Sequence, residues 1–113
     1  MKFRQFDICI ANLDPRFGTE AGKTRPVVIV QTDLLNNTHP STLICPTTTN
    51  IKPKARILRV HLKKGDAGVI NDCDIIVDQL RAIDNKRLIR KIGTLPGSKA
   101  NQLSENLKIV LDL

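Results

Sequence analysis

Short apolar segments fill most of the first 94 residues of this chain, and helical periodicity appears only near its C-terminus. Breaker sequences separate the apolar segments, among them Asp14-Pro15, Gly65-Asp66-Ala67-Gly68 and Pro96-Gly97. The pattern predicts strands over residues 6–13, 25–31, 42–46, 57–62, 75–80 and 88–94. Because a flat sheet of many short strands leaves exposed edges, we expect a compact and strongly curved sheet.

The segment after Pro96-Gly97 has a different period. Its apolar residues Leu103, Leu107, Val110 and Leu111 recur at helical spacing, and Ser98 is a candidate N-cap. The sequence therefore predicts a mainly β fold of the α+β class with one C-terminal amphipathic helix. A length of 113 residues suits a single domain over residues 1–113.

The chain is basic, with 18 Lys and Arg against 11 Asp and Glu and a formal net charge of +7. A positive field of this kind attracts polyanions such as nucleic acid. Charge alone does not separate nucleic acid from anionic lipid or from an acidic protein partner.

Three cysteines, Cys9, Cys45 and Cys73, are odd in number and widely spaced, and each lies among aliphatic neighbours. We expect buried thiols in a reducing compartment rather than disulfides or a metal half-site. The N-terminal residues lack a hydrophobic signal region, and no apolar segment approaches the length of a membrane span. A cytoplasmic location without membrane contact is the expectation.

The segment from Gly22 to Val30 places an arginine where a charged loop becomes an apolar strand. Pro26 fixes its own φ and biases Arg25 toward extended geometry, so the guanidinium has little backbone freedom. Five N–H donors on a rigid strand end suit a phosphate. An arginine that merely begins a surface strand is the plainer alternative for this pair alone.

Several classes of chemistry lose support. His39 and His61 share no ligand spacing, and no cluster of acidic residues lies near them, so we expect surface histidines and no metal or other cofactor. The chain has no phosphate-binding loop of the Gly-x-x-x-x-Gly-Lys-Ser/Thr type and no nucleophile elbow.

What remains is a set of polar residues at predicted strand ends: Arg25, Thr48 and the pair Asp78-Gln79. A curved sheet could bring them together. A cation and a hydroxyl suit RNA transesterification, in which the 2′-hydroxyl attacks the adjacent phosphate and the enzyme supplies no nucleophile.

Several collinear motifs resemble the MazF/PemK family of toxins from type II toxin–antitoxin systems. The matching pieces are Asp7-Ile8, Leu13-Asp14-Pro15, Gly18-Thr19-Glu20, Gly22, Thr24-Arg25-Pro26-Val27-Val28, Pro46-Thr47-Thr48, Asp78-Gln79 and Arg81 with Ile83-Asp84. The resemblance implies an SH3-like small barrel, a homodimer and metal-independent cleavage of single-stranded mRNA, which leaves a 2′,3′-cyclic phosphate and a 5′-hydroxyl. It also implies a cognate antitoxin, for which we expect an acidic segment.

Carried onto this sequence, the resemblance assigns catalysis to Arg25 and Thr48. Asp78 stands where PemK-like members have a carboxylate proposed as general base, or it simply accepts local backbone donors. Ile76 and Thr19 stand where that branch has a second arginine and a histidine, so we prefer the arrangement centred on Arg25 and Thr48.

The remaining candidate residues are expected to contact RNA. They are Arg16, Phe17, Thr19, Glu20, Lys23, Thr47, Gln79 and Arg81. Phe17 could stack on a base or anchor its loop, and Gln79 could bind a base edge or satisfy backbone groups. Two other functions on a related fold are a CcdB-like gyrase inhibitor and a noncatalytic RNA-binding barrel. The absence of tryptophan and of a Trp-Gly-Ile end counts against the first.

Overall fold

The computed structural model describes residues 1–113 and contains seven strands and one α-helix. The strands are β1 (Asp7–Asn12), β2 (Thr24–Ile29), β3 (Ser41–Thr48), β4 (Arg59–Leu62), β5 (Cys73–Ile76), β6 (Arg81–Asp84) and β7 (Leu88–Thr94). Short 3₁₀ turns lie at η1 (Asp66–Gly68), η2 (Val77–Gln79) and η3 (Asn85–Arg87), and α1 (Gly97–Leu111) ends the fold. The predicted mainly β architecture with a C-terminal helix is confirmed.

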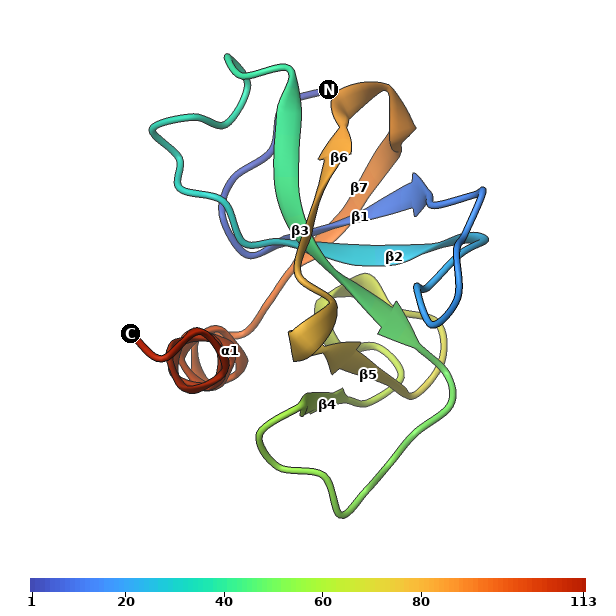
Figure 1. Cartoon of the computed structure of the whole chain (residues 1–113), viewed down its shortest axis with the longest axis vertical. Helices are drawn as coiled ribbons and strands as arrows, with labels where there is room; N and C mark the ends of the chain where they lie inside the picture. Colours follow the sequence, from blue (N-terminus) through green and yellow to red (C-terminus); the bar gives the residue numbers. More distant parts are fainter.

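All strand pairs are antiparallel, in the order β4-β5-β3-β2-β1-β7, with β6 also paired to β3. The long strand β3 joins the two parts of the sheet, because its first half pairs with β6 and its last two residues, Thr47 and Thr48, pair with β5. Figure 1 shows how β3 crosses the molecule and curves the sheet. The end of β3 therefore lies where the two parts of the sheet meet.

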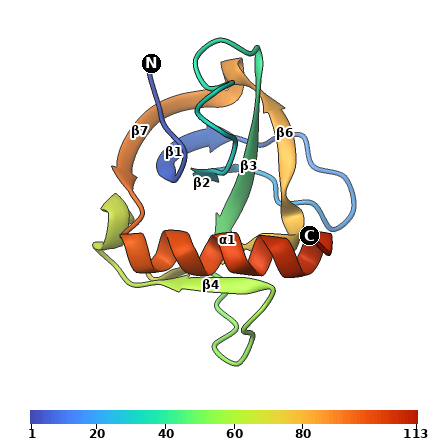
Figure 2. The same cartoon turned by 90° about the vertical axis from the view of Figure 1, so that its left-hand side faces the viewer.

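Strand β1 is covered on both faces, as its sequence predicts. Ile8 packs in a cluster with Leu103 of α1, whereas Cys9 packs in a second cluster with Val27 and Ile44. The helix α1 lies lengthwise beside β4 and closes the first cluster (Figure 2). Leu103 is fully buried, and Ala100 and Asn106 are also buried, so these residues anchor α1.

The structure differs from the prediction at the end of β5 and in the residues that follow it. The predicted strand over residues 75–80 is divided, because the chain turns into η2 at Val77, whose N–H donates to the carbonyl of Leu58. Residues 81–84 then form β6, a strand that the sequence pattern did not indicate.

The start of α1 also differs from the prediction. Pro96, not Ser98, precedes the first helical residue, and no side chain caps the helix; instead the Ala100 N–H donates to the Pro96 carbonyl. All three cysteines are buried and free, as expected. None of the helices has the length and apolar character needed to cross a membrane.

Candidate functional site

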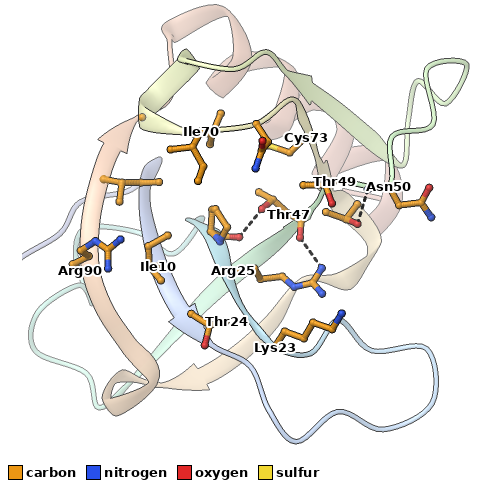
Figure 3. A pocket seen from close by; sticks show the side chains of 16 residues that line it. Ile10, Lys23, Thr24, Arg25, Thr47, Thr49, Asn50, Ile70, Cys73 and Arg90 are labelled. Atoms are coloured by element: carbon orange, nitrogen blue, oxygen red, sulfur yellow. Dashed lines mark hydrogen bonds between the residues drawn. The ribbon is translucent and has the colours of Figure 1, made fainter.

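A cavity of about 620 Å³ opens beside the junction of β2 and β3. Figure 3 shows the side chains around it, which come from β1, β2, the end of β3, the η1–β5 connection and β7. The lining residues are Ile10, Lys23, Thr24, Arg25, Pro26, Thr47, Thr48, Thr49, Asn50, Gly68, Val69, Ile70, Asn71, Cys73, Arg90 and Ile92. No aspartate, glutamate or histidine is among them, so every formal charge at the cavity is positive.

Main-chain carbonyls on two sides hold Arg25 in this cavity. Its Nε donates to the carbonyl of Gly22 at 2.7 Å, and its Nη1 donates to the carbonyl of Thr47 at 2.9 Å. Since a guanidinium has five N–H donors, about three remain for another acceptor. The side chain is half-buried at the start of β2, in the extended setting that Pro26 favours.

Desolvation lowers the pKa of Arg25 from its ordinary value, and the nearby charge of Arg16 lowers it further, while Asp14 acts in the opposite direction. A bound phosphate would relieve this repulsion between cations.

The two threonines at the end of β3 have different hydrogen bonds. Thr47 is 2% exposed, and its hydroxyl donates to the carbonyl of Pro26 at 2.7 Å. The hydroxyl oxygen of Thr48 accepts the Asn50 N–H at 3.1 Å, which leaves its own O–H free to donate. Thr48 therefore has a hydroxyl proton available for an acceptor in the cavity.

The predicted site residues divide into two groups. Lys23, Arg25, Thr47 and Thr48 all line the cavity. The other predicted residues do not line it: Arg16, Phe17, Thr19, Glu20, Asp78, Gln79 and Arg81. Asp78 is exposed in η2, and Phe17 is 75% exposed on the β1–β2 loop.

Gln79 fastens the β1–β2 loop, residues 13–23. Its Oε1 accepts the Ala21 N–H at 2.7 Å, and its Nε2 donates to the Thr19 carbonyl at 2.8 Å. Both polar atoms of the side-chain amide are therefore bonded to main-chain groups, so Gln79 satisfies backbone groups, one of the two roles that we considered for it. The far side of the same loop is held by Arg87, whose Nη1 donates to the carbonyls of Asn12 and Asp14.

Comparison with known sequences places this arrangement in a family. Residues 4–111 match the sequence profile of a family described as PemK-like, MazF-like toxin of type II toxin-antitoxin system. The chain belongs to this family. A relative of this toxin, the endoribonuclease MazF of Staphylococcus epidermidis, is 36% identical over 111 residues, covering 97% of this chain and 92% of the relative.

Solved structures share the fold of the toxin. MazF from Deinococcus radiodurans matches with a TM-score of 0.85 at 20% identity, over 100% of this chain and 99% of that one. The Mycobacterium tuberculosis toxin MazF-mt6 matches with a TM-score of 0.78 at 25% identity, over 95% and 97% of the two chains. A mycobacterial endoribonuclease solved in complex with its cognate antitoxin matches at 0.76 and 14% identity, over 99% and 95%.

Sequence reasoning missed several lining residues of the toxin, among them Asn50, Ile70, Asn71 and Arg90. Arg90 lies in a predicted strand to which no ligand role was assigned, and its pairing with Ile10 of β1 brings it to the cavity. Motif spacing gave no signal for the η1–β5 connection, which approaches the cavity through tertiary packing.

His61 is partly exposed, as expected of a surface histidine, and it also has partners that the sequence did not indicate. Its Nδ1 lies 2.6 Å from Oδ1 of the fully buried Asp74, and its Nε2 lies 3.0 Å from the Ala55 carbonyl. The side chain is 36% exposed, and Arg59 shares the same carboxylate at 3.2 Å. The sequence did not indicate these contacts, because Asp74 lies on the neighbouring strand, where it pairs with His61. No group of three or more His, Cys, Asp or Glu residues is arranged to hold a metal ion.

Proposed function

We propose that this toxin is an endoribonuclease that cleaves single-stranded mRNA without a metal ion. Arg25 and Thr48 are its proposed catalytic residues. One observation carries the proposal: free donors of Arg25 and the free hydroxyl of Thr48 line one cavity whose charges are all positive. Its relative from S. epidermidis is named an endoribonuclease, which supports the same activity here.

The reaction needs no nucleophile from the protein. The ribose 2′-oxygen forms a bond to phosphorus, and the bond from phosphorus to the 5′-oxygen breaks. The products are a 2′,3′-cyclic phosphate and a 5′-hydroxyl. Arg25 stabilises the charge that grows on the phosphoryl oxygens, and the Thr48 hydroxyl donates to one of them. DNA is not a substrate, because it lacks the attacking 2′-hydroxyl.

The proton lost by the 2′-hydroxyl passes to solvent in this scheme. Asp78, the possible general base, lies outside the cavity that holds Arg25 and Thr48. The 5′-oxygen takes up a proton from solvent on leaving, because a guanidinium stays protonated in proteins and Arg25 acts chiefly on the phosphoryl oxygens. The scheme balances without a cofactor.

Cleavage of a long, unstructured transcript in the presence of EDTA tests the proposal. We expect defined cuts whose upstream fragments end in a cyclic phosphate, and we expect the matching DNA to remain intact. Arg25→Ala and Thr48→Ala should both stop cutting while circular dichroism is unchanged. Undiminished cleavage by both variants, or the need for a divalent cation, would refute the proposal.

A cognate antitoxin is the partner that membership of this family implies. We propose that an acidic antitoxin segment occupies the cavity and excludes RNA, because the cavity and the net charge of +7 both attract anions. Saturating antitoxin should therefore reduce the binding of an RNA that cannot be cleaved because it has a 2′-deoxyribose at the cut. Equal RNA binding with and without antitoxin would argue against a shared site.

The toxin is further proposed to act as a homodimer. Exposed apolar side chains near the end of α1, Ile109, Val110 and Leu113, provide surface that an interface would cover. Sedimentation equilibrium should give twice the monomer mass, and a monomer at all concentrations would contradict the proposal.

A further inference from the structure

Three basic residues lie in or just before strand β7, and they have different partners. Arg87, which immediately precedes the strand, donates to main-chain carbonyls of the β1–β2 loop. Lys91 forms an ion pair with Asp7 at 3.2 Å. Arg90 is exposed, has no hydrogen bond or ion pair, and lines the cavity that contains Arg25. Arg90 is therefore the β7 cation available to a ligand in this cavity.

An apolar strip separates Arg90 from the Arg25 end of the cavity. Ile10 pairs with Arg90 on one side and with Pro26 on the other, so these three residues form one row across β7, β1 and β2. In Figure 3, Arg90 and Arg25 lie on opposite sides of Ile10. Ile70, which is 78% exposed, lines the cavity together with Ile92. Arg90 thus stands at one end of this row and Pro26, the residue after Arg25, stands at the other, with the apolar Ile10 between them.

The cavity is larger than a single phosphate requires. Neighbouring strands lie about 4.8 Å apart, so two spacings place the backbones of β7 and β2 roughly 10 Å apart. The cavity of about 620 Å³ falls within the range of roughly 300 to 1,000 Å³ for sites that enclose drug-sized ligands. The cavity is therefore large enough for a sugar and a base beside the phosphate that Arg25 would bind.

We propose that the Arg90 end of the cavity is a subsite for the nucleotide next to the scissile phosphate. The base of that nucleotide rests on Ile10 and Ile70, and its outer phosphate binds Arg90, while Arg25 holds the scissile phosphate. The inference rests on the proposed ribonuclease function and adds a specific neighbouring contact. Apolar contact with a base edge and a second phosphate would favour some flanking nucleotides over others.

Binding of a non-cleavable RNA tests the phosphate contact. The RNA carries a 2′-deoxyribose at the mapped cut, and single methylphosphonates neutralise each neighbouring phosphate in turn. We expect Arg90→Gln to weaken binding about tenfold and to lower the salt slope by about 0.7, the value for one single-strand phosphate contact. One methylphosphonate position should weaken binding by wild type and not by Arg90→Gln.

Lys108→Gln is the matched control, because it removes one positive charge from exposed α1 and leaves the cavity intact. It should change binding less than twofold and show the wild-type methylphosphonate profile. The subsite is refuted if Arg90→Gln changes RNA binding no more than Lys108→Gln does. It is also refuted if Arg90→Gln weakens binding but stays as sensitive as wild type to every methylphosphonate. Cleavage by wild type would persist in that case, which separates this failure from failure of the proposed function.

Abasic substitutions test the apolar strip. An abasic site at the nucleotide next to the cut should weaken wild-type binding by about fivefold, as expected for lost apolar contact. Ile70→Ala should reduce that penalty to less than twofold, and the exposure of Ile70 makes the variant safe for folding. An equal penalty in both proteins would show that the base does not rest on this strip.

Discussion

The guanidinium of Arg25 donates to the main-chain carbonyl of Thr47, the residue that directly precedes Thr48. The bond joins the start of β2 to the end of β3, beyond the last ladder pair of these strands, Val27 with Pro46. The same residue, Thr47, also donates its hydroxyl to the Pro26 carbonyl. Direct β2–β3 contacts therefore hold Arg25 and Thr48 relative to each other, and such preorganisation favours electrostatic catalysis.

Arg25→Lys should retain the positive charge at this position and lose the planar arrangement of hydrogen-bond donors. A lysine cannot donate to the Gly22 and Thr47 carbonyls and a phosphate in the same planar arrangement. We expect single-turnover cleavage to fall by about 10²- to 10³-fold, the usual loss when one transition-state donor is removed. Stopped-flow cleavage of a fluorescent RNA measures the change, and unchanged thermal unfolding is the control. A lysine variant of wild-type rate would show that charge alone suffices.

Thr48→Val and Thr48→Ser separate the hydroxyl from the shape of the side chain. Valine keeps the branched shape and removes the donor, so cleavage should fall by about 10²-fold. Serine keeps the hydroxyl and should stay within about fivefold of wild type. The Asn50 N–H that loses its acceptor is exposed, so stability should change little. Equal rates for both variants would remove Thr48 from the chemistry.

Asp78→Asn tests whether a carboxylate outside the cavity takes part. A general base typically contributes about 10²- to 10⁴-fold. Because Asp78 does not line the cavity with Arg25, we expect less than a fivefold change in cleavage rate. The rate should be measured across pH, since loss of a true base would also remove the acid limb of the profile. A loss of 10²-fold with an altered pH profile would restore Asp78 as the base.

The fold was largely predictable from local pattern. The apolar residues on both faces of β1 indicated a covered strand, and the period of Leu103 and Leu107 indicated α1. The region after β5 was not predictable in the same way. The backbone turns at Val77 while its side chain stays fully buried, so the apolar run continues where the strand has ended.

The candidate site was predictable only in part. The motifs around Arg25 and Thr48 indicated residues that now line one cavity. Arg90 could not be found in this way, because its place depends on the register of β7 against β1, where two irregularities shift the pairing. His61 shows the same limit, since its partner Asp74 lies on another strand.

Buried thiols should make the toxin less stable in alkali. Burial, with a smaller effect of the Asp78 charge, raises the pKa of Cys45 to about 12, and burial raises the pKa of Cys9 to about 11. The stability that these protonated thiols contribute is complete below pH about 9 and is lost as pH rises toward the folded pKa. Urea unfolding should show a loss of about 1.4 kcal/mol per thiol at pH 10 relative to pH 8.

Cys45→Ala is the variant that isolates one thiol. Its free energy of unfolding should be lower than that of wild type at pH 8, because a buried atom is lost, and the difference should shrink by about 1.4 kcal/mol at pH 10. A constant difference would mean that Cys45 does not titrate on unfolding. Native protein should also resist iodoacetamide at pH 8, because all three cysteines are buried.

Gln79→Met should loosen the β1–β2 loop while keeping the size of the side chain. It removes the acceptor for the Ala21 N–H and the donor to the Thr19 carbonyl, and Ala21 is only 7% exposed. We expect unfolding to become easier by about 1 to 3 kcal/mol and hydrogen exchange to increase at residues 19–22. Because Gly22 holds the Nε of Arg25, kcat should fall as the loop loosens, whereas loss of an RNA contact alone would raise KM. Faster exchange with unchanged kcat would show that Gln79 fastens the loop without positioning Arg25.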